Sequence, residues 1–246
     1  MKAVILAGGK GTRLKPYTIL IPKPLVPVGE KAILEILIER LKSNGITEFI
    51  LCVNHFADLI MAYFGDGRKW GVHIEYSIED KPLGTIAPLK QVRNLPDDFL
   101  VTNGDVLTDL SFRQFHEYHL LHQAVLTVAV HKRKQRIDYG VIQSDDTDNV
   151  AVGFSEKPEL DLNVSMGVYG LNKRVLDTVP DDAPFGFDDL VMTLLGSKQT
   201  VKLYPHTGYW LDIGRPDDYE RANQDIEVRG SAPQPHDGLE SPARRP

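Results

Sequence analysis

The feature that most constrains the fold is an apolar run near the start of the chain that passes straight into a glycine-rich loop. Residues 2–6 are mainly apolar and include two β-branched side chains, the pattern of a strand buried on both faces of a parallel sheet. Gly8, Gly9 and Gly11 follow, and glycines let the backbone approach a ligand closely and aim its N–H groups at it. The sequence therefore predicts an α/β sheet with an anion-binding loop after its first strand.

Strand-like and helix-like segments alternate through the first 130 residues. Apolar residues recur at helical spacing over 33–41 and stop before Asn44-Gly45, which predicts a helix there. Further buried strands are predicted over residues 49–53, 72–77, 99–102 and 124–130. Because strands separated by helix-length segments are joined by right-handed crossovers, we expect an α/β, Rossmann-like, doubly wound mixed sheet that is mostly parallel.

The second half of the chain is richer in short strands. They are expected over residues 139–143, 150–155 and 164–171, followed by helices over 187–195 and 216–227. We interpret this half as a strand-rich extension of the same sheet, so that residues 1–228 form one domain. Residues 229–246 hold four prolines and a single large apolar residue, Leu239, and we expect a disordered C-terminal tail there.

Composition narrows the classes of partner. The net charge is -6, so the chain lacks the basic surplus typical of proteins that bind nucleic acid or anionic membranes. No apolar run approaches the roughly 18 residues that a membrane-spanning helix needs. The single cysteine, Cys52, cannot form an internal disulfide and lies in an apolar run, which indicates a core position. We therefore expect a cytoplasmic protein without a nucleic acid or membrane partner.

Two familiar phosphate-binding motifs do not fit the glycine loop. A P-loop has Gly-Lys followed by Ser or Thr, whereas here Lys10 precedes Gly11. A dinucleotide fingerprint needs a glycine where Leu14 stands and a helix that begins at once, whereas Pro16 and the prolines after it keep the chain extended. Arg13 can bind phosphate through two parallel hydrogen bonds. A plain turn would need neither the three glycines nor these cations.

A second unit places a lysine between two prolines. Pro22 and Pro24 stiffen the backbone on both sides of Lys23, so its ammonium group is presented at a low entropic cost. Taken by itself, this pattern is also typical of a solvated lysine in a loop, and that alternative stays open at this point.

Together with later motifs, these units resemble the sugar-phosphate nucleotidyltransferases, and among them the mannose and heptose 1-phosphate guanylyltransferases. The resemblance runs from Met1 to about Glu227, and its motifs stand in the family's order. They are Leu6-Ala7-Gly8-Gly9-x-Gly11-Thr12-Arg13-Leu14, Pro22-Lys23-Pro24, Pro82-Leu83-Gly84-Thr85, Gly104-Asp105, Tyr139-Gly140-Val141, Glu156-Lys157-Pro158 and Trp210-Leu211-Asp212-Ile213-Gly214. The first and last motifs are the most specific.

The resemblance implies an in-line attack by a sugar 1-phosphate on the α-phosphorus of a nucleoside triphosphate, with release of pyrophosphate. Such chemistry depends on positioned charge more than on covalent catalysis. Overall likeness favours GTP and a mannose or manno-heptose 1-phosphate, and the alternative within the family is UTP or dTTP with glucose 1-phosphate. Whether the chain forms a homo-oligomer is left open.

The same resemblance assigns roles to individual residues. Nucleotide binding is implied for Leu6, Ala7, Gly8, Gly9, Gly11, Thr12, Arg13, Lys23, Pro82, Gly84, Thr85 and Asp105. Sugar binding is implied for Asn103, Gly104, Gly140, Glu156, Lys157, Ser165 and Gly167. The implied catalytic residues are Arg13, Lys23, Asp105 and Lys157, and the implied Mg²⁺ ligands are Asp105 and Asp212.

A non-catalytic sugar-nucleotide sensor on the same fold is the rival from a different class. Such a protein would be expected to lose a metal carboxylate, the glycine-loop arginine or the site lysines. All of these are present here, namely Arg13, Lys23, Asp105, Lys157 and Asp212. The charged residues therefore favour an enzyme.

Residue chemistry alone is also compatible with purely structural or solvated roles at some of these positions. An aspartate after a strand, such as Asp105, is typical of a turn, and Asp212 could cap the helix that begins near Pro216. A neighbouring Glu156 and Lys157 before a proline are typical of a solvated pair.

Departures from the family pattern concern specificity. Ile86 and Pro88 stand where many members have small residues, which predicts added bulk near the base. Ser165 stands where many members have asparagine, which predicts a changed contact to the sugar.

Three histidines recur at a spacing of three residues, at His116, His119 and His122. That spacing drifts around a helix over six residues, and few carboxylates lie nearby. We therefore expect solvated or capping roles rather than metal ligands.

Overall fold

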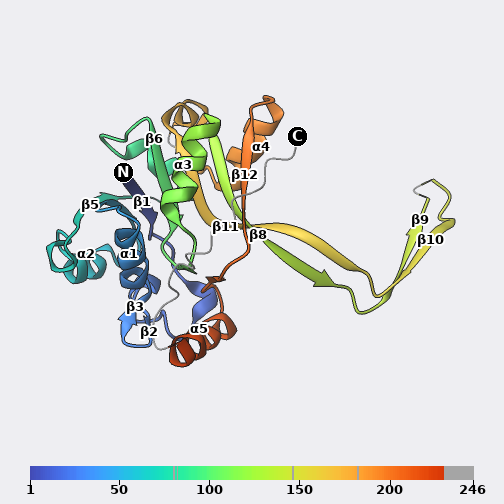
Figure 1. Ribbon diagram of the computed structural model, residues 1–246, viewed down its shortest axis with the longest axis horizontal. Coiled ribbons are helices and arrows are strands. Elements are labelled where there is room, and N and C mark those ends of the chain that lie inside the picture. Colours follow the sequence, from blue (N-terminus) through green and yellow to red (C-terminus); the bar gives the residue numbers. More distant parts are fainter. Residues whose placement is uncertain (80, 82, 146, 182, 230–246) are drawn as a thin grey trace.

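The computed structural model describes all residues except 80, 82, 146, 182 and 230–246 (Figure 1). The strands of its main sheet are β1 (Lys2–Leu6), β4 (Glu48–Val53), β5 (His73–Ile78), β6 (Asp98–Asn103), β8 (Leu126–Arg136), β11 (Glu159–Asn172) and β12 (Val201–His206). Within the described residues they are ordered β12-β8-β11-β6-β1-β4-β5. Strands β1, β4, β5 and β6 are parallel, β12 is parallel to β8, and β11 alone runs antiparallel between β6 and β8. The predicted mostly parallel, doubly wound mixed sheet is confirmed.

Helices cover both faces of this sheet because successive strand residues point to opposite sides. In β1, Ala3 and Ile5 pack into the cluster with α1 (Ile33–Ser43), α2 (Ala57–Phe64) and α3 (Phe112–His122). The intervening Val4 packs into a second cluster with α4 (Phe187–Gly196). Cys52 is fully buried in that second cluster, as its apolar surroundings predict. No helix in the described part of the chain is long and apolar enough to cross a bilayer.

A third hydrophobic cluster ties the segments around the glycine loop together. It joins the short strands β2 (Pro27–Val28), β7 (Val106–Thr108) and β13 (Trp210–Asp212) to helices α1 and α5 (Pro216–Arg229). Strand β2 also pairs with β3 (Lys31–Ala32). Leu14 from the loop is fully buried in this cluster, together with Leu211 from β13 and Ala222 from α5. Chain segments from both ends of the sequence are thereby held beside the first strand.

The second half departs from expectation in one respect. Strands β9 (Gly140–Ser144) and β10 (Ala151–Glu156) pair only with each other and do not join the main sheet. Beyond the pair Val130↔Ser165, β8 and β11 leave the sheet side by side and continue toward this hairpin. Figure 1 shows the resulting projection, which we call the arm (residues 131–165), standing away from the rest of the molecule.

The change in residue type along β8 explains where the arm begins. Residues 126–130 are buried and apolar except for Thr127, whereas 132–136 read Lys-Arg-Lys-Gln-Arg and are exposed. Five consecutive polar side chains cannot lie in a sheet that is covered by helices on both faces. The expectation that this whole half extends the main sheet is therefore wrong for β9 and β10, whereas the outer parts of β8 and β11 stay paired with each other as a continuation of that sheet.

The predicted tail lies outside the described residues from 230 onward. Helix α5 ends at Arg229, so the predicted domain boundary after residue 228 falls one residue inside that helix. The assignment of 1–228 to one domain and 229–246 to a disordered tail stays a prediction.

Two residues expected near the base lie elsewhere. Ile86 is fully buried in the second cluster, directly before a 3₁₀ turn over Ala87–Gln91, and Pro88 is buried within that turn. The Ile86 and Ala87 backbone N–H groups both donate to the Phe185 carbonyl at 3.1 Å. The interpretation of these two side chains as bulk near the base is wrong, because the turn directs them into the core.

The expectation of a solvated or capping role is also wrong for His119. Helix α3 turns its side chain toward the sheet, where it is 0% exposed. Its Nδ1 lies 2.8 Å from Thr127 Oγ1, and its Nε2 lies 3.3 Å from Asp98 Oδ1. His122, in contrast, is on the exposed side of the helix, and its Nδ1 lies 2.9 Å from the Tyr118 carbonyl.

This burial makes stability depend on pH. Burial lowers the pKa of His119 from 6.5, although the Asp98 charge opposes the shift, and burial together with the His119 charge lowers the pKa of His116. These histidines then bind protons more readily in the unfolded chain than in the folded chain. The free energy of unfolding therefore decreases as the pH falls below about 6.5. We expect His119→Asn to flatten the decline in Tm between about pH 7.5 and 5.5, measured by calorimetry, with His122→Asn as the control. An equally steep decline in both variants would assign the pH dependence to other groups.

Candidate active site

A cavity of about 550 Å³ opens where β1 and β6 end. Thirteen predicted site residues line it, namely Leu6, Ala7, Gly8, Gly9, Gly11, Thr12, Arg13, Lys23, Gly84, Thr85, Asn103, Gly104 and Asp105. Lys10, Pro24, Asn54, Glu79 and Gly214 complete the lining. The glycine loop, the Pro-Lys-Pro unit and the Gly-Asp after β6 therefore meet at one place, although they are far apart in sequence.

The glycine loop has the shape that its sequence predicts. Gly11 adopts a left-handed conformation with φ 61°, and a side chain there would lie 3.0 Å from Thr18 Cγ2 and 3.1 Å from Lys23 Cβ. The Thr18 hydroxyl donates to the Gly11 carbonyl at 2.8 Å, which holds the turn closed. A glycine is needed here because both the positive φ and the close packing exclude other residues. The loop thus brings Lys23 beside the first strand.

The carboxylates of Asp105 and Asp212 lie next to each other. Asp105 follows β6, while Asp212 ends β13, which pairs with β7 so that Asp212 is opposite Val106. The Ile213 N–H also donates to the Asp105 carbonyl at 3.2 Å. Burial, and then the adjacent Asp105 charge, raise the pKa of Asp212 to about 6, while Lys23 and Arg13 act in the opposite direction.

One carboxylate oxygen of this pair lacks a partner. Lys23 Nζ forms an ion pair with Asp105 Oδ2, and both side chains are mostly buried. Among the described residues, Asp105 Oδ1 is buried without any hydrogen bond. Leaving an acceptor oxygen unsatisfied is costly, so the arrangement is suited to a cation or a donor supplied from outside the chain.

The alternative roles of these residues fit the structure less well. Lys23 is not a solvated loop lysine, since its side chain is only 12% exposed and paired with Asp105. The Arg215 N–H, directly before α5, donates a hydrogen bond to Asp218 Oδ2 at 3.0 Å. Asp218 therefore caps the start of this helix, the role that was considered for Asp212. Asp212 itself faces Asp105 instead.

The segment after β5 forms another part of the cavity wall through Gly84 and Thr85. Gly84 has φ 90°, and a side chain there would lie 2.8 Å from the Phe185 carbonyl. Thr85 Oγ1 accepts a hydrogen bond from the Phe187 N–H at 2.9 Å, which fastens this segment to α4. Pro82, predicted to contact the nucleotide, lies outside the described residues.

Sequence reasoning missed Glu79 and Asn54 in this cavity. Glu79 is buried directly after β5, and the Asn54 amide donates to its carbonyl at 2.7 Å. Burial raises the pKa of the Glu79 carboxyl, and a hydrogen bond from the Leu83 backbone opposes the shift. An acidic residue at the carboxyl end of a parallel strand, three positions before Pro82, was the available signal.

Two predicted sugar-binding residues lie at the border of the cavity. Gly167 has φ 73° at an irregularity in β11, and a side chain there would lie 2.7 Å from Nδ2 of Asn103, which lines the cavity. Ser165 Oγ accepts a hydrogen bond from the Gly167 N–H at 3.3 Å and so supports this turn. Neither residue lines the cavity itself.

The remaining predicted sugar-binding residues are remote from the cavity of the same chain. Gly140 begins β9, Glu156 ends β10 and Lys157 follows it, so all three lie on the arm. Lys157 has φ 46°, a left-handed conformation that costs a residue with a side chain roughly 1–2 kcal/mol. The structure does not bring these residues together with Arg13 and Asp105, because the arm points away from the body (Figure 1).

Comparisons with known proteins agree with this geometry. A family model described as nucleotidyl transferase matches residues 2–229. A mannose-1-phosphate guanyltransferase of Candida albicans is 35% identical over 227 residues, covering 89% of this chain and 62% of the relative. A mannose-1-phosphate guanylyltransferase of Mycobacterium tuberculosis is 35% identical over 242 residues, covering 95% of this chain and 66% of the relative. The chain thus spans a little under two thirds of the length of these curated relatives.

Solved structures show the same architecture. The structure of HddC from Yersinia pseudotuberculosis, complexed with GMP-PN, matches with a TM-score of 0.70 and 29% identity, covering 92% of this chain and 99% of that one. A second structure, of a putative glucose-1-phosphate thymidylyltransferase from Bacillus anthracis, shares the fold with a TM-score of 0.72 and 24% identity. The match covers 91% of this chain and 94% of that one. From its glycine loop, its paired carboxylates and the match over residues 2–229, the chain belongs to the nucleotidyl transferase family.

Proposed function

We propose that this chain transfers a guanylyl group from GTP to a mannose-type sugar 1-phosphate. An oxygen of the sugar 1-phosphate attacks the α-phosphorus of GTP, the bond from that phosphorus to the bridging oxygen breaks, and pyrophosphate leaves. The observation that carries the proposal is the convergence of the glycine loop, Arg13, Lys23 and Asp105 on one cavity. The curated relatives support the choice of sugar, since both described above are named for mannose 1-phosphate.

The loop and its cations supply the triphosphate seat. Backbone N–H groups at successive glycines can surround phosphate oxygens, and Lys10 and Arg13 line the same cavity. We assign Arg13 to the departing pyrophosphate, because a guanidinium can bind two phosphate oxygens at once. Charge placed in advance where it develops during the reaction lowers the barrier without reorganisation.

Lys23 is held in position by Asp105. Their ion pair is mostly buried, so the ammonium group is kept in the cavity rather than free in solvent. We assign Lys23 to the phosphate at the reacting centre, where its charge opposes the repulsion between two anionic substrates. A lysine fixed in this way loses less entropy on binding phosphate than a mobile one.

The carboxylate pair fits a divalent cation. Among the described residues Asp105 Oδ1 is buried without a partner, and the pKa of Asp212 is raised first by burial and then by the adjacent Asp105 charge. Mg²⁺ commonly takes one or two carboxylates and completes its shell with water and phosphate oxygens, so two aspartates are enough as protein ligands. When bound, Mg²⁺ would neutralise phosphate charge and orient the triphosphate. Asp105 and Asp212 are the residues that would hold it.

Glu79 supports guanine as the base. Guanine carries two neighbouring donors, the N1–H and the 2-amino group, and a carboxylate can accept from both. Glu79 lines the cavity beside Gly8, where a side chain would lie 3.2 Å from Glu79 Oε1. The carboxylate is therefore held against the glycine loop, on the side of Gly84 and Thr85. Neither uracil nor thymine offers two adjacent donors, which disfavours the UTP or dTTP alternative.

We predict that Glu79→Gln reduces the preference for GTP over inosine triphosphate, which lacks the 2-amino group. The wild type should prefer GTP by about tenfold or more in kcat/KM, because a hydrogen bond to a charged acceptor contributes about 1.5–3 kcal/mol. The variant should lose most of that preference by losing activity with GTP. Pyrophosphate release with both nucleotides measures the ratio. If the ratio is the same in both proteins, Glu79 does not read the base.

The deciding experiment is a pyrophosphate-release assay with the four common triphosphates and a panel of sugar 1-phosphates. We expect turnover with GTP and mannose 1-phosphate or a manno-heptose 1-phosphate. Turnover with UTP or dTTP and glucose 1-phosphate would establish the alternative within the family. Binding without pyrophosphate release would identify a sensor. We place the activity in residues 1–228 and in the cytoplasm, as expected from the sequence.

A further inference from the structure

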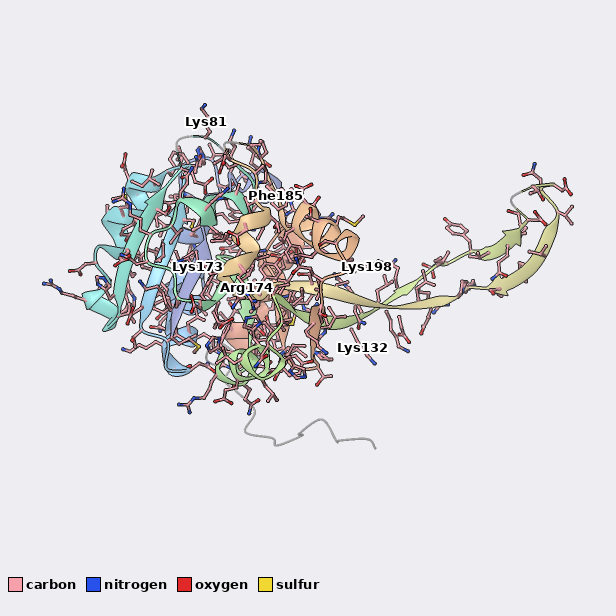
Figure 2. The ribbon with its side chains drawn as sticks, turned by 90° about the horizontal axis from the view of Figure 1, so that it is seen from above. Lys81, Lys132, Lys173, Arg174, Phe185 and Lys198 are labelled. Atoms are coloured by element: carbon pink, nitrogen blue, oxygen red, sulfur yellow. The ribbon has the colours of Figure 1, made fainter. Side chains whose placement is uncertain are left out.

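The arm carries apolar side chains that no other described part of the chain covers. None of the described residues from 131 to 165 is buried. Tyr139 is 78% exposed and Phe154 66% exposed, and large parts of Ile142, Val150, Val152, Leu160 and Leu162 are exposed as well. Figure 2 shows the arm's side chains standing free of the body beyond Lys132. An isolated two-stranded ribbon is at best marginally stable in water, so this surface is suited to being covered by another molecule.

The apolar residues of the hairpin share a face with the predicted sugar-binding residues. In the β9–β10 ladder, Gly140 is opposite Glu156 and Ile142 is opposite Phe154. Residues two apart on a strand point to the same side, so these four positions lie on one face. A side chain at Gly140 would lie 2.7 Å from the Phe154 ring and 3.2 Å from Glu156 Oε2, which confirms that they are neighbours. Whatever covers Ile142 and Phe154 is therefore also brought to Gly140 and Glu156.

The cavity lacks what the arm carries. Three cations line it, and of these Lys23 is already paired with Asp105, while Lys10 and Arg13 belong to the glycine loop. The reaction brings a second anion, the sugar phosphate, to a site that holds a triphosphate, and no arm residue lines the cavity. Lys157 offers a further positive charge for this second anion. Its strained left-handed backbone conformation sets the direction of the chain at the end of β10.

We propose that the arm of one copy of this chain covers the cavity of a second copy and supplies Gly140, Glu156 and Lys157 to it. The exchange is reciprocal in a two-fold dimer, so that each active site combines the body of one chain with the arm of the other. This inference rests on the proposed function, because it assigns the sugar phosphate to those three residues.

The shape of the arm favours a second copy over the body from which it grows. Hydrogen-bonded pairing of β8 and β11 continues from Val130↔Ser165 out to Glu159↔Arg136, and the Ile137 N–H then donates to the Pro158 carbonyl at 3.0 Å. Folding this ribbon back onto its own cavity would require breaking that ladder. Strands rise about 3.3 Å per residue, so the ribbon reaches on the order of 40 Å, comparable with the width of a domain of this size.

Complementation between two damaged variants tests the proposal. Asp105→Asn damages the body and leaves the arm intact, while Lys157→Ala damages the arm and leaves the body intact. We expect the dimer that contains one chain of each, purified through two different affinity tags, to recover about half of the wild-type turnover, because one of its two sites combines an intact body with an intact arm. The assay holds the sugar 1-phosphate well below the wild-type KM, where each variant alone should show at most about a tenth of the wild-type turnover, because Lys157→Ala acts through that KM. If the mixed dimer is as inactive as the single variants, the arm does not act on a second copy.

The mass in solution gives a readout that does not depend on activity. Light scattering should find the wild-type chain as a dimer and the double variant Ile142→Asp, Phe154→Asp as a monomer that retains the wild-type circular dichroism of the body. A wild-type chain that is monomeric at assay concentrations would overturn the proposal. If the wild type forms the arm-dependent dimer but releases no pyrophosphate from any substrate pair, the proposed function fails while the exchange of arms stands.

Discussion

Asp105→Asn is expected to lower turnover by at least about 100-fold, a barrier increase of ~2.7 kcal/mol, while the protein stays folded. The amide has nearly the same shape as the carboxylate but removes the negative charge that holds Lys23 in the cavity. It also removes the charge at Asp105 Oδ1, the buried oxygen that has no partner in the described structure and that suits a divalent cation. Steady-state pyrophosphate release at saturating substrates measures the loss.

Asp181→Asn is the matched control for this variant. Asp181 is also an aspartate paired with a lysine, Lys90, but its side chain is 85% exposed and neither residue lines the cavity. An exposed pair of this kind contributes little, so turnover and Tm should both stay close to wild type. Excess chelator should reproduce the effect of Asp105→Asn on the wild-type enzyme. Full turnover in excess chelator would show that Asp105 and Asp212 do not act as metal ligands.

Lys157→Ala is expected to raise the KM for the sugar 1-phosphate by about tenfold or more, because each charge-assisted hydrogen bond to phosphate contributes about 1.5–3 kcal/mol. Binding of GTP, measured by calorimetry, should change by less than about twofold, since the triphosphate seat is built from the glycine loop. Comparison of the two substrates separates a specific role of Lys157 from general damage to the arm.

Lys134→Ala provides the control on the same arm. Lys134 lies in the exposed part of β8 and is 3.4 Å from Glu159, a pair that is open to solvent on both sides. Its loss should leave both substrates unaffected. Equal damage to GTP binding and sugar phosphate use in Lys157→Ala would show that the lysine serves the other substrate, and equal effects of the two lysine variants would show that only the total charge of the arm matters.

Local sequence patterns determined the core of the fold and the nucleotide seat. The strand over residues 2–6, the helix from residue 33 and the glycine loop are set by neighbouring residues alone, because apolar spacing and glycine conformation act over a few positions. The resemblance of the motifs to a known family indicated which segments form the site and in which order they follow along the chain. Most of the residues assigned to the nucleotide in this way line the cavity.

Tertiary structure decided how distant groups meet. Asp212 lies beside Asp105 only because β13 pairs with β7, and the sequence of neither strand specifies that partner. Glu79 enters the cavity because β4 and β5 are adjacent and parallel, a register that depends on packing across the whole sheet. The burial of His119 likewise depends on which side of α3 meets the strands.

The arm marks the limit of reading this chain from its sequence. The resemblance of the motifs around Gly140 and Lys157 to a known family implies what those residues contact. The polar run over 132–136 explains why the segment leaves the covered sheet once the structure is seen, although the sequence analysis did not predict it. Neither pattern specifies the direction in which the ribbon then runs. That direction follows from the continuous pairing of β8 with β11, a contact between strands that are separated in sequence and joined only in the folded chain. Sequence therefore determined the chemistry of these residues, and tertiary structure decided that they lie away from their own cavity, because strand pairing sets where a side chain is delivered.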